Sequence, residues 1–192
     1  MRHFVSLLGL CTVMVFSAFS APEPGSLELS FRYDKKAGPG SNQYAVWIED
    51  ADGQVVKTLF VTQLTSKGRG RGGSKPARGY TYRPSCTPTW VQHIDADSLS
   101  DQQIDAFTGA TPAKSGVQTF TWDFTDQDGR PVAQGTYRFY IEATYNGPSV
   151  VTYTGTVTCG APAGDLPVEI SYTEPSEDRK DMVTDVKARM IH

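Results

Sequence analysis

Few side chains in this sequence have the chemistry of a catalytic centre. Outside an apolar N-terminal segment, the chain keeps two histidines and two cysteines: His93, His192, Cys86 and Cys159. A hydrolase triad would need one of these histidines beside a nucleophile, but the nucleophile motif G-x-S-x-G is absent. The spacing of a zinc site, a phosphate-binding loop and a dinucleotide fingerprint are absent too. The sequence therefore does not indicate a stand-alone enzyme, and we predict no catalytic residue and no metal site.

Two short Asp-Gly segments place carboxylates close together in the chain. Residues 50–53 have the sequence DADG, and residues 126–129 have the sequence DQDG. Neither has the full spacing of a helix-loop-helix calcium loop. Aspartate and glycine are also the residues that hairpin turns use most. We therefore predict two turns, with calcium binding as the alternative.

A basic, Gly-rich segment at about residues 65–83 holds six Lys and Arg residues and no acidic residue. Guanidinium groups bind phosphate well, but few aromatic side chains are nearby to stack on bases. The whole chain has a net charge of −3, so it has no overall basic field that would attract nucleic acid. We predict a surface loop, with a phosphate or partner contact as the alternative, and no nucleic-acid binding.

The N-terminus has the pattern of a secretory signal. Arg2 supplies the charged start, an uncharged apolar run follows to Phe19, and small residues offer a cleavage site near Ser20. The run is short for a membrane span, so an uncleaved anchor is the weaker interpretation. We predict a signal peptide over residues 1–20 and an exported protein that is not embedded in the membrane after cleavage.

Export would place the two cysteines outside the signal peptide, Cys86 and Cys159, in an oxidising compartment. An even pair in an oxidising compartment favours a disulfide, so we predict a bond between Cys86 and Cys159. The alternative is two independent buried thiols.

The composition fits one globular domain over residues 21–192. Of the 192 residues 39% are hydrophobic, which is ample for a core and excludes a collagen, a coiled coil or a fully disordered chain. Alternation of apolar and polar residues predicts strands near residues 27–33, 43–48, 55–62, 117–124, 136–145, 150–158, 168–172 and 186–190. Thr89-Trp90-Val91 is a further short strand in this interpretation, and Asn146-Gly147 is a hairpin turn.

One short helix is expected within residues 98–107, where Ser100 and Gln103 have the spacing of a capping box. The three tryptophans, Trp47, Trp90 and Trp122, are expected in the core. Seven to nine strands with frequent turns predict an all-β, immunoglobulin-like β-sandwich with at most one helix.

The segment Asp105-Ala106-Phe107-Thr108-Gly109-Ala110-Thr111 resembles the acceptor motif for covalent flavin attachment, D-x-x-[ST]-G-A-[TS]. In the families that carry this motif, a flavin transferase moves FMN from FAD onto the last hydroxyl residue as a phosphoester. The resemblance implies an acceptor hydroxyl on Thr111, with Asp105, Thr108, Gly109 and Ala110 as the recognition motif. The alternative is a Gly-containing turn before the next strand.

Several longer segments are similar to a bacterial periplasmic family known as domain of unknown function 2271. They are Tyr44–Asp50, Gly53–Leu59, Thr89-Trp90, the segment from Asp105 to Thr111, and much of Thr121–Glu142. Members of this family often accompany flavin transferases and membrane electron-transfer proteins. The resemblance therefore implies a periplasmic electron-transfer accessory with FMN on Thr111, whose ring Trp90, His93 or a tyrosine would shield. The alternative is a cofactor-free binding or structural module that docks on a periplasmic or membrane partner.

Overall fold

A computed structural model describes residues 25–38, 40–68, 85–95, 98–145, 149–174 and 181–192. The predicted signal peptide, most of the basic loop and the predicted turn at residues 146–147 lie outside the described residues. No helix within the described ranges is long and apolar enough to cross a membrane.

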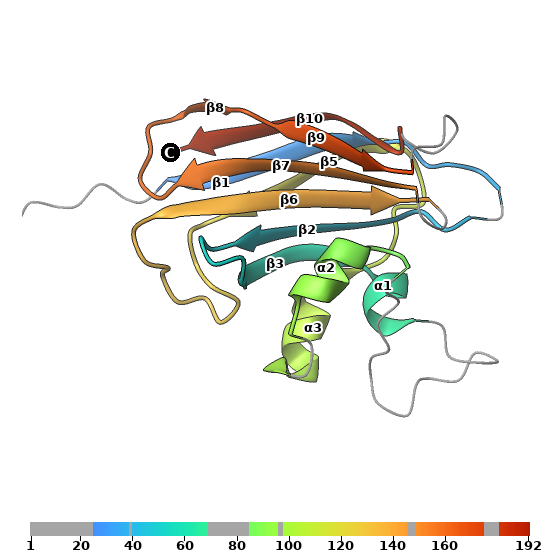
Figure 1. Cartoon of the computed structure of the whole chain (residues 1–192), viewed down its shortest axis with the longest axis horizontal. Helices are drawn as coiled ribbons and strands as arrows, with labels where there is room; N and C mark the ends of the chain where they lie inside the picture. The colour runs from blue at the N-terminus through green and yellow to red at the C-terminus, as the bar shows by residue number, and fades with distance from the viewer. Residues whose placement is uncertain (1–24, 39, 69–84, 96–97, 146–148, 175–180) are drawn as a thin grey trace, which may run out of the picture.

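Two stacked β-sheets make up most of the molecule (Figure 1). One sheet has the strand order β5-β1-β10-β8, and the other has the order β4-β3-β2-β6-β7-β9. The strands are β1 (Ser26–Tyr33), β2 (Gln43–Glu49), β3 (Val55–Thr62), β4 (Thr108–Gly109), β5 (Gly116–Trp122), β6 (Thr136–Thr144), β7 (Val150–Thr158), β8 (Gly164–Leu166), β9 (Glu169–Thr173) and β10 (Val183–Ile191). The helices are α1 (Gln63–Lys67), α2 (Pro88–His93) and α3 (Asp101–Phe107).

The main core lies between the two sheets, and it follows the period of two in the sequence. Along β1 the residues Leu27, Leu29, Phe31 and Tyr33 are all buried, whereas the residues between them are at least partly exposed. Tyr137, Phe139 and Ile141 of β6 are buried against them from the facing sheet. The alternation in these segments therefore placed the strands correctly.

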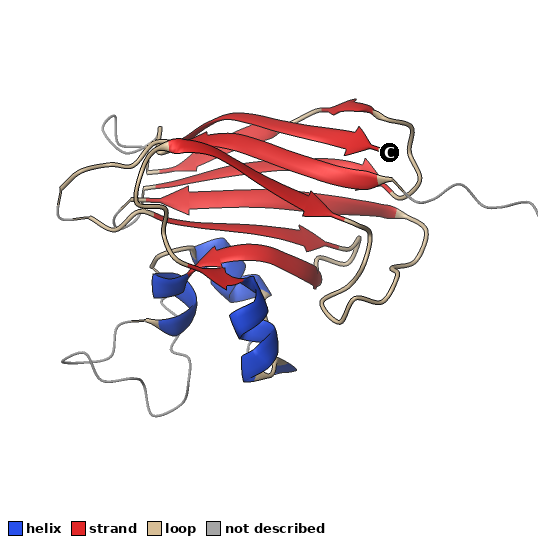
Figure 2. Ribbon diagram, turned by 180° about the vertical axis from the view of Figure 1, so that it is seen from behind, coloured by secondary structure: helices blue, strands red, loops and turns tan. Residues whose placement is uncertain are grey.

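A second, smaller core lies under the helices, which gather beside β2 and β3 (Figure 2). Trp47 of β2 and Trp90 of α2 are fully buried there, and Trp122 is fully buried in the main core. The prediction that all three tryptophans lie in the core is confirmed. Ile104 and Phe107 of α3 complete the smaller core.

The helices correct two predictions. Thr89-Trp90-Val91 lies inside α2 and is not a strand, because Pro88 starts a helical turn whose first amides are bound by a distant carboxylate, Glu142. The start of the basic segment forms α1. The third helix, α3, is confirmed together with its capping box: Gln103 N–H bonds to Ser100 Oγ, and the Gln103 side chain bonds back to Ser100.

The fold is thus mostly β, with two sheets of four and six strands among the described residues. It has ten strands and three helices there, more than the seven to nine strands and single helix predicted. The extra strands are short edge strands, β4 and β8, whose two and three residues show too little alternation to be recognised. The finer assignment to an immunoglobulin-like sandwich stays a prediction.

The predicted disulfide between Cys86 and Cys159 is wrong: these two cysteines are not bonded to each other, and both are buried. Cys159 lies in the main core just after Thr158, which pairs with Thr136 at the start of β6. Cys86 precedes α2, whose first amides bond to Glu142, six residues further along β6. Six residues of strand span about 20 Å, whereas a disulfide needs Cα atoms within about 7 Å.

Candidate functional site

The segment from Asp105 to Thr111 forms the edge of the six-stranded sheet and then leaves it. Asp105 lies in the last turn of α3, and Thr108 and Gly109 form β4, which pairs in parallel with Val61 and Thr62 of β3. Residues 110–115 then cross to the other sheet, where β5 begins. Ala110 is exposed and Thr111 is partly buried. The structure therefore brings the five predicted site residues together at one corner of the molecule.

Two residues of the motif have a clear structural role. The Thr108 hydroxyl donates to the carbonyl of Ile104 at 2.7 Å and also contacts Ser66 Oγ at 2.9 Å, so it ties β4 to α3 and α1. Gly109 packs on the ring of Phe60: a Cβ at this position would lie only 2.2 Å from Phe60 Cε2. Any larger residue at 109 would have to displace Phe60 or β4.

Asp105 is exposed and forms an ion pair with Lys67 of α1. The pair joins two helices across the surface near β4. An exposed ion pair of this kind contributes little to stability, about 0–1 kcal/mol. Asp105 therefore sits where a second protein can reach it.

Within the described part of the chain, the Thr111 hydroxyl makes one contact, a long hydrogen bond of 3.3 Å that it donates to the carbonyl of Asn42. Hydrogen bonds from neighbouring residues fix the position of that carbonyl. The Asn42 side chain exchanges two hydrogen bonds with the backbone of Lys36, and Gln43 Nε2 donates to the Asn42 carbonyl at 2.7 Å. Thr111 is thus a partly exposed hydroxyl on a well-supported loop.

The surroundings of Thr111 hold a cation and two half-buried rings. Lys35 is exposed, and its Nζ donates to the carbonyl of Ala113, two residues after Thr111. Beside Gly109, the ring of Phe60 lies 5.4 Å from the ring of Phe120 of β5, centroid to centroid, and both are partly exposed. The corner therefore combines a hydroxyl, an ammonium group and an aromatic surface.

Two of the side chains expected to shield a flavin ring, Trp90 and His93, belong to α2 and are held by contacts elsewhere. Trp90 is fully buried, and its indole N–H donates to Thr58 Oγ1 at 3.0 Å. His93 bonds to Glu49, at the far end of β2 from Asn42, which is about 20 Å along the strand. The expectation that one of these two side chains shields a flavin ring at Thr111 therefore finds no support in their positions, and shielding by a tyrosine stays a prediction.

Two buried glutamates under α2 were missed in the sequence analysis. Glu142 is fully buried and accepts the backbone N–H groups of Thr89 and Trp90 at 2.9 and 3.0 Å, so it caps the start of α2. Burial raises the pKa of Glu142, and these two amide hydrogen bonds oppose the shift. The sequence carried no signal for this role, because Glu142 stands on the same side of the alternation as Arg138, where a polar residue is expected to be exposed.

Glu49 binds the other end of α2. Its Oε1 accepts the indole N–H of Trp47 at 2.7 Å and lies 2.6 Å from His93 Nδ1. The Trp47 ring also stacks on Tyr140 at 4.8 Å. Since Glu49 is buried and satisfied inside the chain, this group positions α2 and offers no nucleophile.

Both Asp-Gly segments are turns, as predicted. In each, the first aspartate, Asp50 or Asp126, accepts hydrogen bonds from the backbone N–H groups two and four residues later, at 2.9–3.0 Å. Gly53 and Gly129 have φ angles of 78° and 80°, which glycine adopts without strain. The Arg130 amide lowers the pKa of Asp126. Within the described part of the chain, no cluster of three or more His, Cys, Asp or Glu side chains is placed to hold a metal ion.

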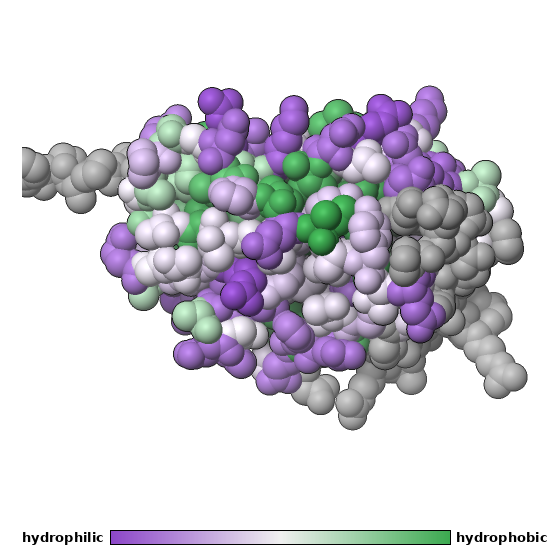
Figure 3. Space-filling model, turned by 45° about the horizontal axis from the view of Figure 1, so that its top comes forward, coloured by the Kyte–Doolittle hydropathy of each residue, from purple (hydrophilic) through white to green (hydrophobic). Residues whose placement is uncertain are grey.

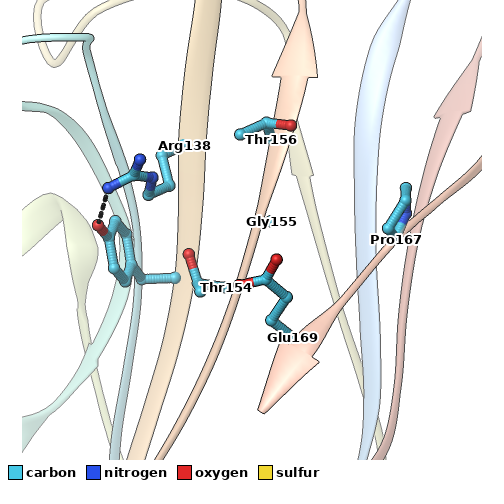
Figure 4. A pocket seen from close by; sticks show the side chains of 7 residues that line it. Arg138, Thr154, Gly155, Thr156, Pro167 and Glu169 are labelled. Atoms are coloured by element: carbon cyan, nitrogen blue, oxygen red, sulfur yellow. Dashed lines mark hydrogen bonds between the residues drawn. The ribbon is translucent and has the colours of Figure 1, made fainter. Parts of the chain in front are cut away.

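A shallow groove of about 320 Å³ lies on the outer face of β6, β7 and β9 (Figure 4). Its lining is polar: Arg138, Tyr140, Thr154, Gly155, Thr156, Pro167 and Glu169. The Arg138 guanidinium bonds to the Tyr140 hydroxyl at 3.3 Å. The lining contains no nucleophile beside a general base, so its side chains offer polar contacts and no reaction.

These features define a mostly β, two-sheet protein with a helical cap and a partly exposed hydroxyl at the corner where the chain changes sheets. The family described as "Predicted periplasmic protein (DUF2271)" matches residues 26–156. The match covers more than half of the chain, which therefore belongs to this family, and the predicted periplasmic localisation is confirmed. Neither the curated proteins nor the solved structures include a match to the chain.

Proposed function

We propose that this protein is a periplasmic electron-transfer accessory that carries FMN on the hydroxyl of Thr111. The observation that supports it most is the position of Thr111: a partly exposed hydroxyl, next to the exposed Ala110, at the end of a segment that matches every fixed position of the acceptor motif. A modification added by another enzyme needs such a reachable surface loop.

The residues at the corner fit a flavin phosphate. The Asn42 carbonyl orients the Thr111 hydroxyl, and the Lys35 ammonium lies near the same loop, where it favours negative charge. The partly exposed rings of Phe60 and Phe120 provide an aromatic surface beside Gly109. When bound, the flavin supplies the one- and two-electron redox chemistry, which the described side chains do not provide.

The attachment is a phosphoryl transfer. The Thr111 Oγ forms a bond to the FMN phosphorus of FAD, the pyrophosphate bond breaks, and AMP leaves. The hydroxyl proton goes to a base of the transferase. In this step Thr111 is the acceptor, and Asp105, Thr108, Gly109 and Ala110 present it to a partner flavin transferase.

The test is co-expression in the periplasm with a flavin transferase, followed by intact mass and in-gel flavin fluorescence. We expect the wild-type protein and Thr111→Ser to gain the mass of FMN and to fluoresce, because both keep the hydroxyl. Thr111→Val removes the hydroxyl at nearly constant volume and should stay unlabelled. Equal labelling of Thr111→Val and wild type would show that the site lies elsewhere.

The second candidate is a cofactor-free module that docks on a periplasmic or membrane partner. One observation favours it: Thr108 and Gly109 have structural roles that explain their residue types without a cofactor. A colourless protein, produced beside a transferase that labels another acceptor, would support this function and exclude the first.

A further inference from the structure

Strand β9 is an open edge of the six-stranded sheet. In the part of the chain that the structure describes, β9 pairs with β7 on one side only, from Glu169 opposite Thr154 to Thr173 opposite Val150, with no shift in register. All five of its residues are exposed. Proteins protect exposed edges with charged side chains, prolines or bulges. β9 has no proline and no bulge, and its one charged residue, Glu169, stands at its first position. Among the described residues no strand pairs with its outer backbone N–H and C=O groups, which can therefore bond to another strand.

The same strand carries two exposed apolar side chains. Ile170 is 49% exposed and Tyr172 is 44% exposed. They lie opposite Tyr153 and Val151 of β7, which are buried, so all four side chains are on the core-facing side of the sheet. Ile170 and Tyr172 nevertheless stay about half exposed to solvent. Leu166, Val168 and Val186 are partly buried and pack against the main core. Figure 3, in which the top of Figure 1 is turned forward, shows a patch of apolar side chains on that side of the molecule.

We propose that β9 pairs antiparallel with β9 of a second copy of this chain, about a two-fold axis at Ser171. This pairing would join the two six-stranded sheets into one continuous sheet. A two-fold interface must be complementary to itself, and β9 meets this condition in sequence and in charge.

With Ser171 opposite Ser171 of the second copy, Ile170 lies opposite Tyr172 on the apolar side. Aromatic and β-branched cross-strand pairs are among those that stabilise sheets. Glu169 lies opposite Thr173, so no two carboxylates face each other. A shift of register by two residues in one direction would place Glu169 directly opposite Ser171 and would remove the pairing of Ile170 with Tyr172.

The other long edge, β5, does not have this symmetry. Its one large, highly exposed apolar residue is Val117, which is 71% exposed. A two-fold axis at Thr119, the middle of the strand, would place Val117 opposite Thr121, a polar residue. The edge of β9 is therefore the one whose apolar side chains match a second copy.

The test uses the register itself. In the proposed dimer, Ser171→Cys places two thiols on Cα atoms about 4.5–5.5 Å apart, within reach of a disulfide. We expect mild oxidation to link most of this variant into a covalent dimer. Thr173→Cys should not link to itself, because it faces Glu169. Val117→Cys, also at an exposed position but on the other edge, measures linking by random collision, and the wild type gives the background of the two buried cysteines.

Sedimentation of the unmodified protein provides the second measurement. We expect a dimer whose dissociation constant rises by about tenfold or more in Ile170→Lys, while Val117→Lys leaves it unchanged. Circular dichroism checks that each variant is folded. A wild-type protein that sediments as a monomer at every concentration overturns the proposal. So does a Ser171→Cys variant that links no faster than Val117→Cys, which would leave the β9 edge to a different partner.

Discussion

Two regions beside the six-stranded sheet hold polar side chains that differ in burial and in hydrogen bonding. Under α2, Glu49 and Glu142 are 2% and 0% exposed, and each carboxylate binds two groups of the same chain. At the corner beside β4, the Thr111 hydroxyl is partly exposed and makes a single long hydrogen bond within the described part of the chain. The first region is closed to other molecules, and the second is open to them.

The difference separates structural from functional polar groups. A buried carboxylate must be bonded inside the protein, because leaving it unpaired costs several kcal/mol. Glu142 meets this need by fixing the start of α2. A hydroxyl that a partner enzyme modifies must instead reach solvent on a rigid support, and the Asn42 carbonyl and the Thr108 contacts provide that support.

The largest effect is expected from Glu142→Ala. The substitution leaves the amides of Thr89 and Trp90 without their acceptor in a buried place and opens a cavity beneath α2. We expect a loss of about 3 kcal/mol in the free energy of unfolding, measured by chemical denaturation. A loss below about 1 kcal/mol would contradict the structural role of this carboxylate.

The next effect is expected from Gly109→Ala, because its Cβ would meet the Phe60 ring at 2.2 Å. We expect a loss of about 1–3 kcal/mol in the free energy of unfolding and weaker flavin labelling, since β4 must shift. The matched control is Gly116→Ala, where a Cβ meets no atom within 4 Å. Equal behaviour of the two variants would show that the Phe60 contact does not position the loop.

The pH dependence of stability tests whether burial raises the pKa of Glu142. Burial raises its pKa in the folded protein above the ordinary value of 4.5, so the folded state binds the proton more readily than the unfolded chain. The contribution of Glu142 to stability is then greatest below that ordinary value and falls as the pH rises through the raised pKa. Glu142→Gln removes the ionisable carboxyl group, so the stability of this variant has no contribution from its titration.

We therefore expect Glu142→Gln to gain stability relative to wild type as the pH increases from acidic to neutral. Thermal denaturation of both proteins at each pH measures this difference. A difference between the two proteins that stays constant with pH would contradict the raised pKa. A difference that runs in the opposite direction would show that the two amide hydrogen bonds outweigh burial.

The smallest effect on stability is expected from Thr111→Val. Its hydroxyl is partly exposed and its one hydrogen bond is long, so we expect a change within about 0.5 kcal/mol in the free energy of unfolding. Chemical denaturation measures it beside Glu142→Ala. A loss as large as that of Glu142→Ala would mean that Thr111 is a structural residue and would remove the contrast between the two regions.

The sequence predicted the parts of this molecule that depend on local pattern. The alternation in β1 and β6, the capping box of Ser100 and Gln103, and the two Asp-Gly turns each depend on residues close together in the chain. The helix α2 was missed because its start is fixed by Glu142, more than fifty residues away in the sequence. The disulfide was wrong for a related reason: export and an even number of cysteines carry no information on where two residues lie in space.

The candidate site shows the same division. The motif from Asp105 to Thr111 was recognisable in the sequence, and the structure places its residues at one corner. The roles of Phe60, Asn42 and Lys35 at that corner depend on contacts between distant segments, which no local pattern shows.

Peptide mass spectrometry of the protein co-expressed with a flavin transferase tests the central claim most directly. We predict a flavin phosphate on the peptide that contains Thr111, and none on any other peptide. An unmodified Thr111 peptide, obtained beside a transferase that labels a known acceptor in the same cells, would contradict the claim.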